Sequence, residues 1–199
     1  MSDQRLVKGA RSRASIARHA ADVASVEGLS GVSIGRLATD LGLSKSGIAT
    51  LFGTKEALQL AAIRVAREVF VAEVVTPALA VPRGVTRLRA LMERWFAYIV
   101  DPAFPGGCFR SATLAEFDSR PGAVRDTLAG DQEDWLTFLT GELEKAADLG
   151  EIVCPDPAAL AFEIDALVCA ANTARQLGAE SRVDIARAIV TRLLTEAST

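Results

Sequence analysis

A short polar run contains the side chains best suited to bind a nucleic acid. Ser44, Lys45, Ser46 and Thr50 supply hydroxyl and ammonium groups within seven residues. Such groups bind phosphate oxygens and the edges of DNA bases. Gly47 lies among them, and a glycine inside a helix costs about 1 kcal/mol relative to alanine. Its presence therefore suggests that another backbone comes close at this point.

Two short helices joined by a tight turn are predicted to position this run. Ser33 is a natural N-cap, and apolar residues follow it at helical spacing as far as Leu41. Gly42 tolerates the left-handed conformation of a helix end, and Ser44 can cap a second helix that reaches about Phe52. This is the pattern of a helix-turn-helix, whose second helix enters the DNA major groove. Many all-helical proteins contain the same pattern without binding DNA.

The flanking sequence makes the interpretation more specific. Residues 16–28 predict an amphipathic helix that Gly28 ends, and Thr54 can cap the helix after the turn. The run IARHAADVASVEGLSGVSIGRLATDLGLSKSGIATLFGTKEAL resembles the N-terminal domain of the tetracycline-repressor (TetR) family, most specifically in LGLSKSGI and FGTKEAL. The resemblance implies a dimeric, all-helical repressor whose larger C-terminal part senses a small molecule.

Some residues of this run match the family's DNA-contacting positions, and others differ from the family's usual residues. Ala49 stands where the family usually has an aromatic residue, often Tyr, and Leu51 where it commonly has His or Tyr. Loss of a tyrosine hydroxyl removes a phosphate hydrogen bond of about 1.5–3 kcal/mol. Arg36 is a candidate phosphate contact or else a solvated surface side chain. The full set of residues expected to face DNA is Ser33, Arg36, Ser44, Lys45, Ser46, Gly47, Thr50 and Lys55.

The charge distribution agrees with DNA binding at one end of the chain. Residues 1–55 carry eight basic and four acidic side chains, a net charge of +4, whereas the whole chain carries −3. Phosphate contacts require positive charge only locally. The basic residues 1–13 are expected to form a mobile arm that adds DNA contacts, or a disordered start without a role.

Composition argues against several other classes of protein. No apolar run approaches the roughly 20 residues of a membrane span, and the N-terminus lacks the apolar core of a signal peptide, so a cytoplasmic location is expected. Cys108, Cys154 and Cys169 form no CxxC pair and are interpreted as small apolar residues, with redox sensing by Cys108 as the alternative. With His19 as the single histidine, no catalytic residue, metal site or cofactor is expected, and we expect no enzyme.

The remaining sequence predicts six further helices and no strands. Their approximate ranges are 54–75, 84–100, 108–117, 121–149, 157–177 and 181–196, with Ser181 as the cap of the last. The expected fold is therefore all-α. A three-helix DNA-binding domain with its arm spans residues 1–54, and a six-helix ligand-binding and dimerisation domain spans residues 55–199.

Aromatic residues in the C-terminal part suggest an effector site. Aromatic side chains at helical spacing more often form core, but the TetR resemblance implies a ligand cavity between the helices that carry them. Pockets are mostly apolar with a few polar groups, so we expect a small, largely apolar effector. Glu116 and Asn172 are further polar candidates. The expected ligand-binding residues are Trp95, Phe109, Thr113, Phe117, Trp135, Phe138 and Asp165.

The last two predicted helices carry more apolar residues than one packed face requires. The resemblance implies that they pair with their symmetry mates in a homodimer, whereas packing inside one chain is the alternative. A two-fold dimer matches a palindromic operator. A ligand-binding or protein-interaction helical module with weakened or lost DNA binding is the alternative function, suggested by Ala49 and Leu51. The expected interface residues are Leu160, Ile164, Leu167, Ala171, Ile185, Ile189 and Leu193.

Overall fold

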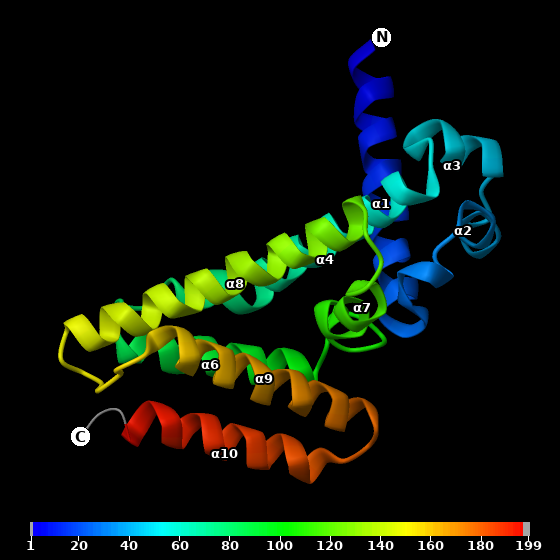
Figure 1. The fold of residues 1–199 in the computed structure, drawn as a ribbon. Helices are drawn as coiled ribbons and strands as arrows, with labels where there is room; N and C mark the ends of the chain where they lie inside the picture. The colour runs from blue at the N-terminus through cyan, green and yellow to red at the C-terminus, as the bar shows by residue number, and fades with distance from the viewer. Residues whose placement is uncertain (1, 197–199) are drawn as a thin grey trace. The chain divides into compact units, whose positions relative to one another are not determined.

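The computed structural model describes the backbone of residues 2–196 and the side chains of residues 9–194, and this part of the chain is helical without strands (Figure 1). The all-α prediction is confirmed. Because α4, η1 and α5 follow one another without a break, the described residues form nine helical stretches, as predicted. The elements are α1 (Ser2–Gly31), α2 (Ile34–Leu41), α3 (Lys45–Phe52), α4 (Lys55–Phe70), the π-helical segment η1 (Val71–Val75), α5 (Thr76–Ala78), α6 (Val85–Val100), α7 (Phe109–Phe117), α8 (Ala123–Asp148), α9 (Pro157–Gln176) and α10 (Glu180–Glu196).

The chain folds into two compact units. The first unit is the chain up to Glu68 together with Phe104–Ala129, and it contains α1, α2, α3, α7 and most of α4. The second unit is Val69–Ala103 together with the chain from Gly130 onward, and it contains η1, α5, α6, α9, α10 and most of α8. In terms of packing, α7 thus belongs with the first three helices. The functional boundary expected after residue 54 stays a prediction.

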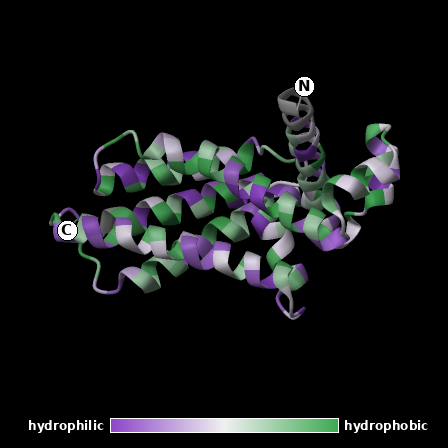
Figure 2. Ribbon diagram, turned by 90° about the horizontal axis from the view of Figure 1, so that it is seen from above, coloured by the Kyte–Doolittle hydropathy of each residue, from purple (hydrophilic) through white to green (hydrophobic). Residues whose placement is uncertain are grey.

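The first unit is built around apolar residues of α1, α2 and α3. Ile16, Leu37 and Ile48, one from each helix, are at most 2% exposed and form part of its core. Hydrophilic and hydrophobic residues alternate along the helices, as the colours of Figure 2 show. In α1, α2 and α3 the buried positions are mainly hydrophobic. Gly28 breaks the helical backbone of α1 with a φ of 74°, as predicted for a stop, although the helix resumes for one turn beyond it.

The second unit packs α6 against α9 and α10, and α6 against η1 and α5. The π-helical segment has a local cause in Pro77, which has no N–H to donate and whose ring clashes with the carbonyl four residues earlier. The helix widens just before this proline, and Thr76 N–H donates to the carbonyl of Val71, five residues back. The helix predicted to end near Val75 therefore continues through α5 to Ala78.

Three predicted helix starts differ from the structure. Residues 2–13, expected as an arm, belong to α1, while Met1 and the side chains of residues 1–8 lie outside the described residues. The last helix begins at Glu180, so Ser181 lies within its first turn and is not its cap. Pro121 precedes α8, which begins at Ala123. Asp156 caps α9 as predicted, because its Oδ1 accepts a hydrogen bond from Ala159 N–H at 2.9 Å.

Candidate functional site

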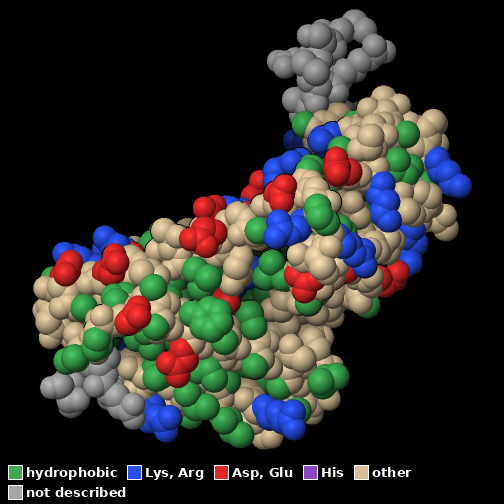
Figure 3. All heavy atoms as spheres, in the orientation of Figure 1, with side chains coloured by type: hydrophobic (Ala, Val, Ile, Leu, Met, Phe, Trp, Pro, Cys, Tyr) green, Lys and Arg blue, Asp and Glu red, His purple; other side chains and the backbone are tan. Residues whose placement is uncertain are grey.

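Helix α3 presents a polar face outward and is anchored by its apolar face. Ile48 and Phe52 are 0% and 6% exposed, whereas Lys45, Ser46 and Thr50 are exposed. Lys and Arg side chains are distributed over the surface of this unit, at the right of the view in Figure 3. A short helix held on one side and polar on the other is the arrangement that reads a DNA major groove.

The predicted caps hold α2 and α3 at the turn between them. Ser33 Oγ accepts from Arg36 N–H at 3.1 Å, and Gly42 ends α2 in the left-handed conformation with a φ of 63°. Ser44 Oγ accepts from Gly47 N–H at 3.0 Å. Each such cap contributes about 1 kcal/mol to stability. The turn geometry follows from these residues as the sequence indicated.

Gly47 has a local explanation within this turn. A Cβ at position 47 would lie 2.9 Å from Ser44 Oγ, closer than carbon and oxygen atoms normally approach. The glycine therefore leaves room for the serine cap. Among the described residues, the group closest to Gly47 is the Ser44 side chain. The sequence had suggested a second backbone at this point instead.

Arg36 is bound by carboxylates of its own unit. Its Nε donates to Asp40 Oδ2 at 2.7 Å, and its guanidinium lies 3.1 Å from Glu27. His19 Nε2 is 3.1 Å from the same Asp40 oxygen and joins α1 to α2. The hydrogen bond from Arg36, followed by that from His19, lowers the pKa of the Asp40 carboxyl below its ordinary value. These two carboxylates offset the charge of Arg36, so it attracts a phosphate less strongly than an unpaired guanidinium would.

Two other basic side chains join helices of the first unit to one another. Lys55 Nζ donates to the Ser30 carbonyl at 2.7 Å, which leaves two of its three N–H donors for other partners. Arg13 donates to the Leu51 carbonyl near the end of α3 and lies over the Phe52 ring at 4.5 Å. Sequence reasoning missed this role, because it assigned Arg13 to an arm. No periodic pattern in the sequence distinguishes Arg13 from its basic neighbours.

The structure divides the predicted effector residues between the two units. Trp95, Trp135 and Phe138 come together in the second unit, with ring centroids 4.7 Å apart for the two tryptophans and 5.9 Å apart for Trp135 and Phe138. Phe109, Thr113 and Phe117 belong to α7 in the first unit, where the Thr113 hydroxyl donates to the carbonyl of Phe109. Phe70, which the sequence did not single out, packs edge to face on Trp95, Trp135 and Tyr98.

A buried carboxylate adjoins the aromatic cluster of the second unit. Asp165 is 6% exposed and accepts hydrogen bonds from Trp135 Nε1 at 3.0 Å and from Gln132 Nε2 at 2.8 Å. Gln132 Oε1 is buried without a hydrogen-bond partner among the described residues. A buried carbonyl oxygen in this state costs about 1–3 kcal/mol. A hydrogen-bond donor on a ligand would remove that cost.

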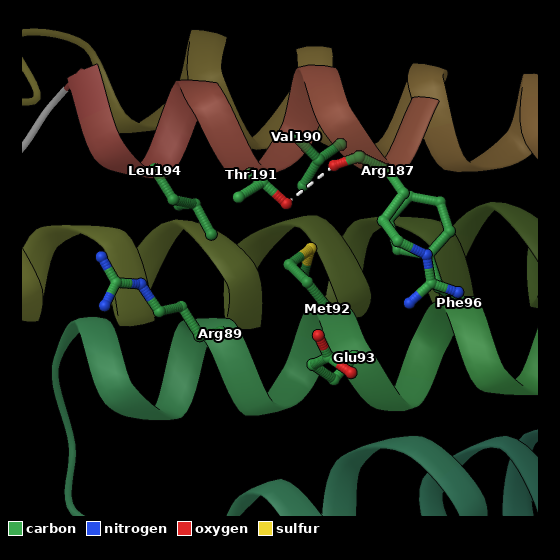
Figure 4. A pocket seen from close by; sticks show the side chains of 8 residues that line it. All are labelled: Arg89, Met92, Glu93, Phe96, Arg187, Val190, Thr191 and Leu194. Carbon is green, nitrogen blue, oxygen red and sulfur yellow. Dashed lines mark hydrogen bonds between the residues drawn. The ribbon is translucent and has the colours of Figure 1, made fainter. Parts of the chain in front are cut away.

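A separate groove lies between α6 and α10 (Figure 4). Met92, Val190 and Leu194 form its apolar lining, with Arg89 at one end and Arg187 at the other. The Arg187 guanidinium lies over the Phe96 ring, 4.8 Å from its centroid. None of the predicted effector residues lines this groove. From the sequence, Met92, Val190 and Leu194 were assigned only to the apolar faces of their helices.

The predicted interface residues are unequally exposed. Ile164 and Ala171 are at most 1% exposed, so the protomer's own packing covers them, whereas Ile185 is 58% exposed. Leu160, Leu167, Ile189 and Leu193 are half-buried. Phe162 and Leu177, which the sequence did not single out, are 66% and 77% exposed. The outward face of α9 is therefore rotated from the predicted one.

Neither metal ligands nor a membrane span are found where the structure is described. Among the side chains of residues 9–194, no group of three or more His, Cys, Asp and Glu is placed to hold a metal ion. No helix in that range combines the length and apolarity of a membrane span. Cys108 is buried, whereas Cys154 and Cys169 are half-buried. Burial, followed by the nearby Asp156 charge, raises the pKa of the Cys154 thiol.

Comparison with known proteins decides the family. The family model described as the tetracyclin repressor-like C-terminal domain matches residues 84–190, more than half of the chain. The chain belongs to the TetR family. This TetR-family protein shares 28% identity with a TetR transcriptional regulator from Chloroflexus aurantiacus J-10-FL over 95% of this chain and 96% of that one, with a TM-score of 0.85.

Two further structures resemble this TetR-family protein throughout. The regulator from Cytophaga hutchinsonii is 25% identical and has a TM-score of 0.80, with 96% of this chain and 97% of that one covered. AibR, solved with isovaleryl coenzyme A and operator DNA, is 21% identical with a TM-score of 0.71, covering 92% and 98%. No curated protein matches the sequence. TetR-family regulators are non-enzymatic DNA-binding transcription factors.

Proposed function

We propose that this TetR-family regulator is a cytoplasmic homodimeric repressor. It binds a palindromic operator through α3 and releases it when a small, largely apolar effector binds. The observation that carries the proposal is the capped helix-turn-helix with Lys45, Ser46 and Thr50 on its exposed face, in a chain of this family. Hydrogen-bonding side chains at the start of such a helix contact base edges and phosphates.

An exposed apolar stripe on α9 supports the homodimer. Its residues recur at helical spacing, and they include the largely exposed Phe162 and Leu177. Hydrophobic side chains gather over α9 and α10 in the lower part of Figure 3. A second copy would remove this area from water, and a two-fold axis would present two recognition helices to a palindrome. The stripe consists of Ala159, Phe162, Ala166 and Ala170 of α9 and of Leu177 directly after it, continued on α10 by Ile185 and Ala188.

The aromatic cluster of the second unit supports an effector site. Trp95, Trp135 and Phe138 offer apolar contact, and Asp165 with Gln132 offers hydrogen-bond acceptors. An apolar ligand with one donor group fits this combination. AibR, with the same fold, was solved with isovaleryl coenzyme A, so compounds that combine a short acyl chain with a hydrogen-bond donor are the first to test.

Weakened DNA binding is the alternative. It is favoured by Ala49, which lacks the hydroxyl of the usual aromatic residue, and by the carboxylates that bind Arg36. The exposed Lys45 and Thr50 support the operator-binding proposal instead.

Selection of bound DNA fragments tests the proposal. The purified protein is mixed with sheared genomic DNA of its source, and bound fragments are sequenced. We expect enrichment of a few fragments that share an inverted repeat. A variant with Lys45→Ala and Thr50→Ala serves as the control and should enrich none of them. Equal recovery of all fragments by both proteins would contradict operator binding.

A further inference from the structure

Glu116 of α7 binds the backbone of the last turn of α1, directly after Gly28. One carboxylate oxygen accepts from Leu29 N–H at 2.7 Å, and the other accepts from Ser30 N–H at 2.9 Å. The Glu116 side chain is only 17% exposed. Charge-assisted hydrogen bonds of this kind are stronger than neutral ones and define direction as well as distance. Glu116 was a candidate effector contact from the sequence, but here it faces α1.

The local backbone is shaped to receive this carboxylate. Gly28 has a φ of 74°, and a Cβ at this position would overlap the Glu116 carboxylate. The glycine both turns the chain and leaves space for the carboxylate. The consecutive N–H groups of Leu29 and Ser30 then point at one anion, in the manner of a backbone nest.

Further contacts join the same turn of α1 to α4 and to the residues that follow α7. Gln59 is 7% exposed, and its Nε2 donates to the Leu29 carbonyl at 2.7 Å. Lys55 donates to the Ser30 carbonyl, and Arg120 donates to the Ser30 hydroxyl at 2.8 Å. Glu116 and its neighbours thus bind both the donors and the acceptors of residues 29–30.

The loop before α7 is equally close to α1. Gly106 N–H donates to Ser25 Oγ at 3.0 Å, and a Cβ at Gly106 would overlap the Ser25 carbonyl. In Figure 1 α7 lies beside the C-terminal part of α1, in agreement with their contacts. Helix α7 lies within the segment that the C-terminal family model matches, whereas α1 and α2 precede it.

We propose that Glu116 is a positioning residue that sets the direction in which α2 and α3 leave α1. Through it, α7 fixes the orientation of the recognition helix within the first unit, and with it the operator half-site spacing that the protein accepts. This inference rests on the proposed operator-binding function. In this role Glu116 contacts neither the DNA nor the effector.

The test compares Glu116→Gln with Glu68→Gln, a charge-neutralising control at an exposed position of α4. The operator is first selected by the unmutated protein from random DNA. Dissociation constants are then measured by fluorescence anisotropy for that operator and for versions with one base pair added to or removed from its centre. Glutamine keeps one acceptor but loses the charge and the second acceptor.

We expect Glu116→Gln to bind the selected operator roughly tenfold more weakly, because charge-assisted bonds to two donors are lost. Its preference for the original spacing over the altered ones should fall about threefold or more, as the helix-turn-helix gains freedom. Glu68→Gln should match the unmutated protein in both respects. Loss of folded protein alone would weaken binding to all three operators by the same factor, with the spacing preference unchanged.

Hydrogen exchange provides a second measurement that does not depend on DNA. The amides of Leu29 and Ser30 should exchange faster in Glu116→Gln, while those of Ile16 and Leu37 keep their rates. Unchanged exchange together with an unchanged spacing preference would overturn the role of Glu116. Failure of the unmutated protein to select any operator would instead overturn the proposed function. If Glu116→Gln does not fold, Arg120→Gln is measured in its place and should shift the same two amides.

Discussion

The exposed Phe162 allows a quantitative test of the proposed dimer. Its residue surface is 66% accessible in the protomer. Complete burial of a phenylalanine side chain stabilises by about 1.5–3 kcal/mol, so covering two-thirds contributes about 1–2 kcal/mol. Because a two-fold interface uses each residue twice, Phe162→Ala should weaken the dimer by about 2–4 kcal/mol. This corresponds to an increase in the dimer dissociation constant of about 30-fold to about 700-fold.

Sedimentation of the protein over a dilution series measures this constant. Val153→Ala is the matched control, since Val153 is 62% exposed in the same unit but lies outside α9 and α10. The control should dimerise like the unmutated protein. If Phe162→Ala and Val153→Ala share the dissociation constant of the unmutated protein, or if that protein is a monomer throughout, the stripe on α9 is not the interface.

Three further predictions concern DNA contacts, acid stability and the buried carboxylate. Lys45→Ala should weaken operator binding by about 1–3 kcal/mol if Lys45 contacts a base. Lys55→Ala should weaken binding to every DNA sequence and make the affinity less dependent on salt concentration. Titrations of both variants over a series of salt concentrations measure these effects. Arg36 lowers the pKa of Asp40 in the folded state. The stability that Asp40 contributes is therefore present above its unfolded pKa and is lost as the pH falls through the folded pKa. In Asp40→Asn, the stability measured by circular dichroism should depend less on pH in this range. Trp135→Phe leaves a buried carboxylate without one donor and should lower the free energy of unfolding in urea by about 1–3 kcal/mol; no change would show that solvent replaces the indole.

Local features of the fold were predictable because they depend on residues close in the sequence. The caps at Ser33, Ser44 and Thr54 and the turn at Gly42 were confirmed, the Thr54 hydroxyl accepting from Ala57 N–H at 3.0 Å. Each of these contacts joins residues at most three or four positions apart. The polar exposed face of α3 follows from the same short-range pattern.

Contacts between distant residues were not predictable from one sequence. Glu116 and Leu29 are 87 positions apart, and no pattern of residue types marks the pair. The outward face of α9 was misplaced because alanines lie on both faces, so apolarity alone did not distinguish Ala171, which is buried, from Ala170, which is exposed. The division of the aromatic residues between two units likewise depends on how the helices pack.

The most direct test of operator reading by α3 is hydroxyl-radical footprinting of the selected operator. We expect protected sugars in two patches related by a two-fold axis and separated by at least one helical turn, about 34–36 Å. Lys45→Ala with Thr50→Ala should remove both patches together at the same protein concentration. A single protected patch, or protection that survives in this double variant, would contradict a dimer that reads its operator through α3.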